Sequence, residues 1–392
     1  MAYVAVKGGE TAIDNSIELL TLSRGDGGAR VEPAAMTARM KRLLDRVMCE
    51  AGLYAPEYAA LALKQSEGCP EEAVFLLRAY RSTLPRSHVS RVADCLDMRL
   101  TRRISSAFKD IPSGQLLGAS YDYTHRLLDF SLAEESESDL QAKRERIIAT
   151  TRERIIASHA DATPADATPA AAAAPDMRAR RVSDLLKDEG LIKTRPICDN
   201  TPDDITRDKL TLPASRSARL QTLFRADTGF VCGVAYAGLR GYGFSAHPTI
   251  GELRRGYVEV EIPYPPDESE SVVLGEIMFT EVEAFVSSHT SRDDREFDEL
   301  GAEIGYGLAF GRAETKAIAM SILDCALDHP GQTPPNDEEF VLLHGESTEM
   351  SGFISHLKLP HYVTFQSKLD NARRTGQNRN SEETGDGNDE RQ

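Results

Sequence analysis

The sequence has no paired cysteines, no long apolar run and no excess of basic residues. Its six cysteines stand singly, without a CxxC pair. This pattern excludes a zinc ribbon or a cysteine-ligated iron–sulfur cluster and is typical of small buried side chains. No apolar run approaches the roughly 18 residues that a membrane helix needs. The first ten residues, MAYVAVKGGE, lack a basic segment followed by an apolar one, so we expect a cytoplasmic protein.

The net charge of the chain limits the classes of molecule that it can bind. The chain has 46 Lys and Arg against 62 Asp and Glu, which gives a formal net charge of -16. This argues against general nucleic-acid binding, which needs a basic surface, although a local basic cluster can still hold a phosphate. With 392 residues, 41% of them hydrophobic, the chain is long enough for two domains or for one large domain with insertions.

The first 130 residues are predicted to be mainly helical. Periodicity predicts a short strand at 3–6, a Gly-Gly turn after Lys7, and helices over 10–22, 37–51, 56–66 and 70–83. A strand, a glycine turn and a helix N-terminus can receive a phosphate, with Lys7 adding charge. A plain strand-to-helix connection is the alternative. In the helix over 70–83, Arg78 and Arg81 are expected on a basic outer side.

Composition changes abruptly in residues 131–179. The sequence RERIIA at 144–149 recurs at 152–157, and an Ala-Pro-rich repeat follows. Such low complexity predicts an inserted linker, with a charged helix before a flexible part and no catalytic residues. Residues 371–392 are polar and Gly-rich, so we expect a disordered tail.

Residues 180–370 are predicted to mix helices and strands. The patterns indicate helices over 180–188, 215–225 and 314–327, and strands over 230–237, 257–262 and 271–286, the last two as an antiparallel pair. Glu276, Glu281 and Glu283 alternate along the last strand and are expected on a wet sheet face. The fold class is therefore α+β, with a helical N-terminal part (1–130) and a mixed, largely antiparallel C-terminal part (180–370).

A dense set of polar groups lies in the stretch YDYTHRLLDF. Residues 121–126 combine five such groups, and the surrounding sequence suggests that the segment is buried. The groups are a carboxylate (Asp122), two phenols (Tyr121 and Tyr123), an imidazole (His125) and a guanidinium (Arg126). These groups suit acid–base chemistry and anion binding. The alternative is the start of a strand or helix with amphipathic aromatics.

Basic residues spaced three or four apart form further candidates. Arg102 and Arg103 precede Lys109, and Arg216 and Arg219 lie in the first turn of a predicted helix. Such residues usually form a solvated face or a partner contact, but their spacing also suits a polyphosphate.

The stretch MSGFISHLKLPHYVTF places His356 and His361 five residues apart, with Pro360 directly before the second. The proline predicts a helical turn through His356, a break, and an extended exit along residues 362–364. Two imidazoles across a tight break can converge as metal ligands, or as an acid and an anion-holding group. Structural histidines in a packed turn are the simpler interpretation of the spacing alone.

Several segments taken together resemble the family of I subunits (PhnI) of the bacterial carbon–phosphorus lyase core complex. The resemblance rests on YVAVKGGE, LALKQ, FLLRAYR, RRIS, GQLLG, YDYTHRLLDF, PDDITR, RGYG, DEEFVL and SHLKLPHYVTFQ. They follow the family's order from residue 3 to about residue 369. Only the repeat-bearing segment 131–174 and the polar tail depart from the pattern.

The resemblance implies a cytoplasmic enzyme of phosphonate use. With the G, H and L proteins of the same system, such subunits are associated with replacing adenine at ribose C1′ of MgATP by an alkylphosphonate. The product is alpha-D-ribose 1-alkylphosphonate 5-triphosphate, and the I subunit is also credited with nucleosidase capability. The resemblance further implies a core assembly with the G, H and J subunits and a peripheral K protein. The iron–sulfur chemistry would belong to J.

The resemblance also implies a metal site and substrate contacts. The family's metal-associated histidine pair maps onto His356 and His361, which would hold a Zn2+ that other groups complete. Breaking an N-glycosidic bond develops positive charge at C1′, so the site needs negative charge near the sugar and an acid for the purine. Asp122 could serve either role, beside Tyr121 and Tyr123 as stacking or donor groups.

His125 and Arg126 are candidates for acid and anion contacts, and Lys7, Lys109, Arg216 and Arg219 for contacts to the triphosphate. Two other readings stay open. The chain is a scaffold that contributes half of a shared metal site, with catalysis on partner subunits, or it is a stand-alone metallohydrolase that holds metal in isolation.

Overall fold

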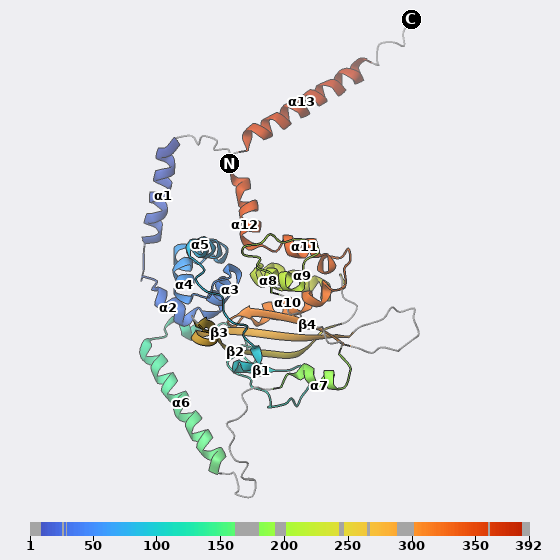
Figure 1. Ribbon diagram of the computed structural model, residues 1–392. Helices are drawn as coiled ribbons and strands as arrows, with labels where there is room; N and C mark the ends of the chain where they lie inside the picture. The colour runs from blue at the N-terminus through green and yellow to red at the C-terminus, as the bar shows by residue number, and fades with distance from the viewer. Residues whose placement is uncertain are drawn as a thin grey trace. The chain divides into compact units, whose positions relative to one another are not determined.

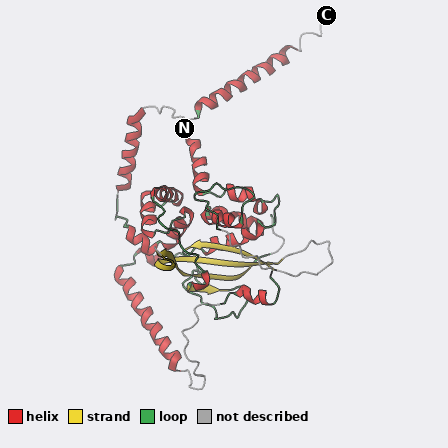
Figure 2. Cartoon of the chain, viewed as in Figure 1, coloured by secondary structure: helices red, strands yellow, loops and turns green. Residues whose placement is uncertain are grey.

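The computed structural model describes residues 9–25, 27–28, 30–160, 180–192, 201–242, 247–264, 267–287, 302–359 and 361–385. The strands gather in one sheet and helices form most of the remaining regular structure, as Figure 2 shows. None of the helices in these ranges is long and apolar enough to cross a membrane.

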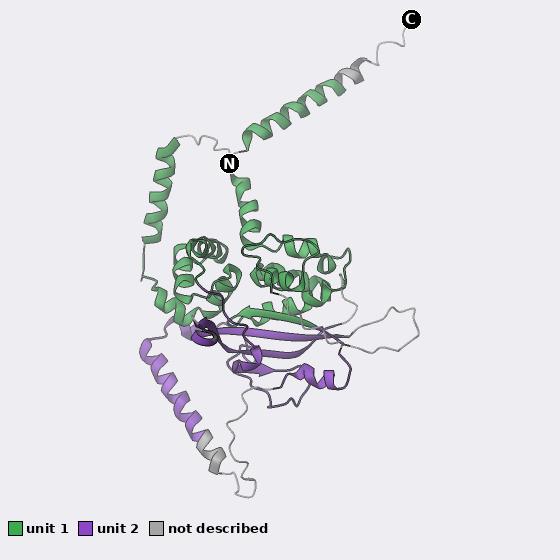
Figure 3. Cartoon of the chain, in the orientation of Figure 1, with its two compact units in different colours: residues 1–87, 197–247, 305–392 green, residues 88–196, 248–304 purple. Residues whose placement is uncertain are grey.

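The chain divides into two compact units (Figure 3). Unit 1 comprises residues 1–87, 197–247 and 305–392, and unit 2 comprises residues 88–196 and 248–304. The helical beginning of the chain and its residues 305–392 therefore share one unit.

Unit 1 starts with α1 (Gly9–Gly25), α2 (Pro33–Arg39), α3 (Lys41–Ala51), α4 (Pro56–Gln65) and α5 (Pro70–Thr83), labelled in Figure 1. Proline opens α2, α4 and α5, where its missing N–H has no helical partner to lose. The helices predicted over 10–22, 56–66 and 70–83 are confirmed. The one predicted over 37–51 is interrupted at Met40, where α2 ends and α3 begins.

The apolar side chains of α1 are exposed rather than packed. Ile13, Ile17, Leu19 and Leu20 are each at least 45% exposed. The strand predicted at 3–6 and Lys7 lie outside the described residues.

The rest of unit 1 contains α8 (Arg216–Arg225), α9 (Thr228–Leu239), part of β4 (Ala302–Phe310), α10 (Glu314–Ala326), η4 (Pro334–Asn336), α11 (Glu338–Leu343), α12 (Ser347–Ser355), η5 (His356–Lys358) and α13 (Tyr362–Gly385). The helices predicted over 215–225 and 314–327 are confirmed as α8 and α10. The tail predicted to be disordered from residue 371 onward overlaps α13, which continues to Gly385, and the prediction of disorder stays a prediction.

The strand predicted over 230–237 is also wrong, since these residues form α9. The Asp227 carboxylate accepts a 2.7 Å hydrogen bond from the Phe230 N–H and caps the helix. Val231, Val234 and Ala235 are buried at helical spacing. A run of apolar and small residues fits either period, and the cap together with the packing selects the helix.

The sequence GYG at residues 305–307 is explained by close packing of β4 on α10. A Cβ atom added to Gly305 would lie 1.9 Å from the Ser321 carbonyl oxygen, and one added to Gly307 would lie 1.8 Å from that of Ala317. The strand approaches the helix backbone more closely than any side chain permits.

Unit 2 contains η1 (Cys95–Asp97), β1 (Arg99–Ile104), η2 (Phe130–Ala133), α6 (Glu137–Ala160), α7 (Val182–Asp188), β2 (Thr249–Tyr264) and β3 (Asp267–Ser287). The strand order of the sheet is β1-β2-β3-β4, and the boundary between the units falls within β4. Strand β2 is antiparallel to both β1 and β3, which confirms the predicted antiparallel pair and the α+β class.

The register of the sheet brings charged residues together. Arg254 on β2 lies opposite Arg103 on β1 and Glu281 on β3, and Glu252 lies opposite Glu283. The charged helix predicted in the insertion is confirmed as α6, while residues 161–179 lie outside the described ranges. The helix predicted over 180–188 is confirmed as α7.

Candidate functional site

The two histidines singled out by the sequence converge in unit 1. His356 lies in η5 directly after α12, and His361 directly precedes α13. Their ring centroids are 5.3 Å apart, with an interplanar angle of 64°. The predicted turn and break are confirmed, because the backbone is extended at Leu359. The predicted extended exit is wrong, since α13 begins at Tyr362 and the Phe365 N–H bonds to the His361 carbonyl oxygen at 3.0 Å.

Both imidazoles are oriented by the backbone. His356 Nδ1 hydrogen-bonds the Phe353 carbonyl oxygen, and His361 Nδ1 hydrogen-bonds the Leu359 carbonyl oxygen at 2.6 Å. A carbonyl oxygen only accepts, so each Nδ1 carries the hydrogen and each neutral ring keeps its Nε2 lone pair. This is the arrangement in which a histidine binds a metal through Nε2.

As a metal site, the pair would be incomplete, because it offers only two imidazoles. Within the described ranges, no group of three or more His, Cys, Asp or Glu side chains is placed to hold a metal ion. The residues present fit a metal whose remaining ligands come from water, substrate or another chain.

An apolar groove of about 750 Å³ adjoins His356. Its lining includes His344, Met350, Phe353 and Ile354. Phe353 and Ile354 are 70% and 65% exposed, so the packed turn that spacing alone favoured is not what forms. Exposed apolar surface of this extent is typical of a binding site.

The YDYTH segment lies in unit 2 and is exposed rather than buried. Tyr121 and Tyr123 are 60% and 69% exposed, and His125 also faces solvent. The segment forms turns rather than a strand or helix start. The structure thus places these side chains in one exposed loop, and their catalytic roles stay predictions.

Asp122 is the anchored member of this loop. It receives a hydrogen bond from the Arg102 guanidinium, and its Oδ1 lies 3.8 Å from Nη2 of Arg126. A hydrogen bond from Ser120, with the charges of Arg102 and Arg126, holds the pKa of the Asp122 carboxyl below its usual range. Asp122 is therefore ionised at neutral pH, which suits a role near developing positive charge better than a role as an acid.

Two buried arginines of the sheet hold the loop in place. Arg102 on β1 also donates to the Leu117 carbonyl oxygen, and Arg255 on β2 donates to that of Ala119 at 2.8 Å. Their side chains project from neighbouring positions of the β1–β2 register. The position of Asp122 is thus set by residues more than a hundred positions apart in the chain.

The other basic candidates have mixed positions. Lys109 is exposed in a loop of unit 2. In unit 1, Arg216 makes a two-pronged ion pair with Asp324, at 3.1 and 2.6 Å, and Arg219 pairs with Glu338 at 2.6 Å. Arg216 and Arg219 thus already have carboxylate partners.

The solvated face predicted for Arg102 and Arg103 is wrong, and so is the wet face predicted for Glu281 and Glu283. The exposed fractions of these residues are 0%, 1%, 2% and 8%. Arg103 Nε donates to Glu252 Oε1 at 2.5 Å, and two arms of Arg181 donate to Glu281 and Glu283 at 2.9 and 3.1 Å. Only Glu276 is exposed as expected, in a pair with Arg99.

Sequence reasoning missed this buried network, although a signal existed. The sequence has two adjacent arginine pairs, at 102–103 and 254–255, and it has glutamates two residues apart at 281 and 283. These opposite charges lie on strands of the same sheet. The match becomes visible only once the register is known. Arg254 is 1% exposed, and its three guanidinium nitrogens have no hydrogen-bond partner in the described part of the chain.

Comparison with known proteins decides the family. The sequence model for the bacterial phosphonate metabolism protein (PhnI) matches residues 2–379. The chain belongs to the PhnI family. The resemblance inferred from the motifs is thereby confirmed.

Relatives match this PhnI chain along nearly its whole length. The putative C-P lyase subunit protein HtxH of Stutzerimonas stutzeri is 43% identical over 395 aligned residues, covering 99% of each chain. The alpha-D-ribose 1-methylphosphonate 5-triphosphate synthase subunit PhnI of Escherichia coli (strain K12) is 42% identical, covering 96% of this chain and 99% of that one. The subunit of the same name in Rhizobium meliloti (strain 1021) is 41% identical and covers 95% of this chain and 94% of that one.

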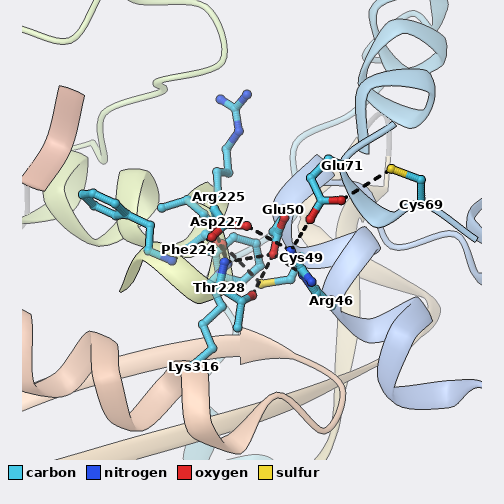
Figure 4. Close-up of polar contacts among 12 residues, drawn as sticks. Arg46, Cys49, Glu50, Cys69, Glu71, Phe224, Arg225, Asp227, Thr228 and Lys316 are labelled. Atoms are coloured by element: carbon cyan, nitrogen blue, oxygen red, sulfur yellow. Dashed lines mark hydrogen bonds and ion pairs between the residues drawn. The ribbon is translucent and has the colours of Figure 1, made fainter. Parts of the chain in front are cut away.

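A second polar network supports unit 1 of this PhnI chain (Figure 4). Arg46 on α3 donates to Glu50, Glu71 and Asp227, each at 2.9 Å, and Glu50 Oε1 also accepts from the N–H and hydroxyl of Thr228. The network joins α3 to the N-terminal ends of α5 and α9. Its carboxylates are engaged by Arg46 and by helix N-termini, so we assign it a structural role.

The C-terminal ends of α3 and α8 bind cations. The buried Lys316 ammonium donates to the carbonyl oxygens of Phe224 and Ala226 at 2.6 and 2.7 Å. Arg78 donates to the carbonyl oxygens of Glu50 and Arg225 and pairs with Glu346. Its side chain is 12% exposed, so the basic outer side predicted for Arg78 is wrong. Cations at helix C-termini offset the negative end of the helix dipole.

Proposed function

We propose that this chain is a subunit of the synthase that replaces adenine at ribose C1′ of MgATP with an alkylphosphonate, giving alpha-D-ribose 1-alkylphosphonate 5-triphosphate. The observation that carries the proposal is the near-full-length similarity to two chains named as that subunit. The reaction is a nucleosidase-like displacement, and the proposed location is the cytoplasm.

The displacement needs an anionic group near the sugar. Positive charge develops at C1′ as the N-glycosidic bond breaks, and a preorganised carboxylate stabilises it. Asp122 meets this requirement because Ser120, Arg102 and Arg126 keep it ionised. His125 is then the candidate proton donor to the departing adenine, with Tyr121 and Tyr123 as stacking or donor groups.

His356 and His361 are proposed to hold a Zn2+ through their Nε2 atoms. When bound, such an ion acts as a Lewis acid toward phosphate or phosphonate oxygens. The support is the backbone hydrogen bond at each Nδ1, which fixes both rings without a substrate present. Arg126, Lys109 and Lys7 remain candidates for the triphosphate, whereas Arg216 and Arg219 would first have to leave their carboxylate partners.

The proposed partners are the G, H and J subunits of the carbon–phosphorus lyase core complex, with L acting functionally and K peripherally. Two exposed apolar surfaces support a multisubunit assembly. One follows the YDYTH loop, with Leu127, Leu128 and Phe130 each at least 78% exposed. The other follows α12 and the start of α13, with Phe353 and Val363 at 70% and 69%. A monomer leaves few such patches uncovered.

The test is adenine release from MgATP and methylphosphonate by the reconstituted complex. We expect His356→Ala and His361→Ala to abolish release and to lower the zinc content of the complex measured by elemental analysis. His329→Ala is the control, because His329 is an exposed histidine of the same unit that does not line the groove beside His356. Unchanged release and zinc content in both variants would refute the metal role.

A separate variant tests the proposed role of the Asp122 carboxylate near the sugar. Asp122→Asn removes the charge and keeps the shape, and we expect release to fall by roughly 10²–10³-fold, the usual effect of losing one electrostatic group at a reacting centre. Asp129→Asn is the control, since Asp129 is an exposed carboxylate of the same loop, held by Ser131. Equal rates for the two variants would show that the assignment to Asp122 is wrong.

A scaffold role is the second candidate, and the two-ligand histidine pair favours it. On this view the chain contributes half of a shared metal site, and partner subunits supply the catalytic acid. Purine release by the isolated chain distinguishes the two. Activity of the chain alone supports catalysis on this subunit. Activity that appears only after partners are added, and that survives Asp122→Asn, supports the scaffold.

A further inference from the structure

Unit 1 contains a pocket of about 370 Å³ that the histidine pair does not line. It lies beside the C-terminal ends of α3 and α8, and Arg81 and Arg225 are its charged residues. Its walls are mainly apolar and include Leu220, Phe224 and Leu308. A pocket of this volume, apolar with a few convergent polar groups, is of the kind that holds small organic ligands.

Neither arginine of this pocket has a carboxylate within ion-pair distance in the described part of the chain. Arg81 Nη1 donates only to the carbonyl oxygens of Ala51 and Gly52, at 2.9 and 3.3 Å. Arg225 Nε is buried without a hydrogen-bond partner. Figure 4 shows the Arg225 side chain extending away from the Arg46 network, with no contact drawn to its guanidinium.

The two arginines approach the same point of the backbone. A Cβ atom added to Gly52 would lie 2.7 Å from Arg81 Nη1 and 3.6 Å from Arg225 Cδ. Gly52 has a left-handed φ of 64°, as the C-cap of α3. The glycine thus leaves room for two cationic side chains side by side at the edge of the pocket.

This placement is electrostatically unfavourable in the empty pocket. Burial, and then the charge of Arg81, lowers the pKa of Arg225. Burial with the charges of Arg225 and Arg81 lowers the pKa of the neighbouring Arg78 to about 9. The adjacent Asp204 carboxylate is engaged by Arg86. The charge of Asp204 acts on the pKa of both arginines in the opposite direction, but Asp204 makes its ion pair with Arg86. Two like charges without a directly paired carboxylate favour binding of an anion.

We propose that this pocket binds a small organic phosphate or phosphonate. Its tetrahedral oxyanion would lie between Arg81 and Arg225, and its apolar or aromatic body would pack on Phe224 and Leu308. The Ser217 hydroxyl accepts a 3.0 Å hydrogen bond from Gln221, which leaves its own hydrogen to donate to the oxyanion. Arginine suits such a group because its planar fork matches phosphate oxygens.

The inference does not rest on the proposed reaction, because the test measures binding without turnover. Phenylphosphonate, AMP and inorganic phosphate are titrated into the full-length chain by calorimetry. We expect at least one of the two organic probes to bind more tightly than inorganic phosphate. We expect Arg225→Met to weaken that probe at least roughly tenfold, the effect of losing a charged hydrogen bond. Arg240→Met, at an exposed position after α9, is the control and should bind as the unaltered chain does.

Thermal unfolding separates binding from folding. The Arg225 guanidinium makes no hydrogen bond to the residues that the structure describes, so Arg225→Met should keep or raise the unfolding temperature while it loses the ligand. Ser217→Phe fills the pocket and keeps both charges, and it should also lose the organic probes. Preference for phenylphosphonate over AMP would identify a phosphonate as the ligand, and the reverse a phosphate ester. Absence of binding, equal affinity for inorganic phosphate, or full binding by both variants would overturn the inference.

Discussion

The buried pair of Arg103 and Glu252 allows a quantitative test of the sheet network. Their side chains are 2% and 1% exposed, and Nε to Oε1 is 2.5 Å. Arg103 also donates to the carbonyl oxygens of Pro112 and Arg180, and Glu252 Oε2 accepts from the Val182 N–H at 3.0 Å. Removing one partner leaves a buried charge unpaired, which typically costs about 3–5 kcal/mol. Arg103→Met also leaves two carbonyl oxygens without their donor, so we expect the upper end of this range.

A double-mutant cycle isolates the pair. The variants are Arg103→Met, Glu252→Leu and both together, and the double variant should be more stable than Arg103→Met alone because it no longer buries the Glu252 carboxylate without its Arg103 hydrogen bond. The exposed pair of Arg99 and Glu276 is the matched control. It joins the same residue types in the same unit, with side chains 54% and 36% exposed. Its coupling energy should be much smaller than that of the buried pair, because water screens both charges.

The assay is urea unfolding followed by circular dichroism, because the chain has no tryptophan for fluorescence. Hydrogen exchange of the β1 and β2 amides would localise the effect to the sheet. The reasoning is refuted if the coupling energy of the buried pair is no larger than that of the exposed pair. That result would mean that burial in this sheet does not desolvate the charges.

Three further predictions follow from the same structure. Arg254→Met should lower the free energy of unfolding by less than Arg103→Met does, because Arg254 lies 3.9 Å from Glu252 without a hydrogen bond, whereas Arg103 donates to Glu252 and to two carbonyl oxygens; an equal or larger loss in urea unfolding would contradict this. Iodoacetamide at pH 8 should alkylate exposed Cys69 well before Cys95, since burial raises the pKa of the Cys95 thiol to about 12; peptide mass spectrometry measures the order. Hydrogen bonds from Thr206 and Arg86 lower the pKa of Asp204 to about 2 from 3.8. The stability that this carboxylate contributes is therefore present above pH 4 and lost as the pH falls toward 2, and an NMR titration with a midpoint near 3.8 would refute the shift.

Local signals in the sequence determined much of the secondary structure. Proline at the first helical position fixed the starts of α4 and α5, and alternation identified the β2–β3 pair. Spacing and Pro360 were enough to predict the break between His356 and His361, although the spacing alone favoured structural histidines in a packed turn. These features depend on neighbours within a few residues, so a linear reading reaches them.

The tertiary structure decided where charge is buried. Arg103 and Glu252 are 149 residues apart. Each charge can be buried because the pairing of β1 with β2 places the opposite charge next to it. The same holds for Arg78, whose acceptors are the ends of two helices that are distant in sequence. The helix at 228–239 likewise depends on packing rather than on its ambiguous apolar pattern. Burial is a property of the assembled fold, and the desolvation cost of a charge is offset by partners that no local pattern reveals.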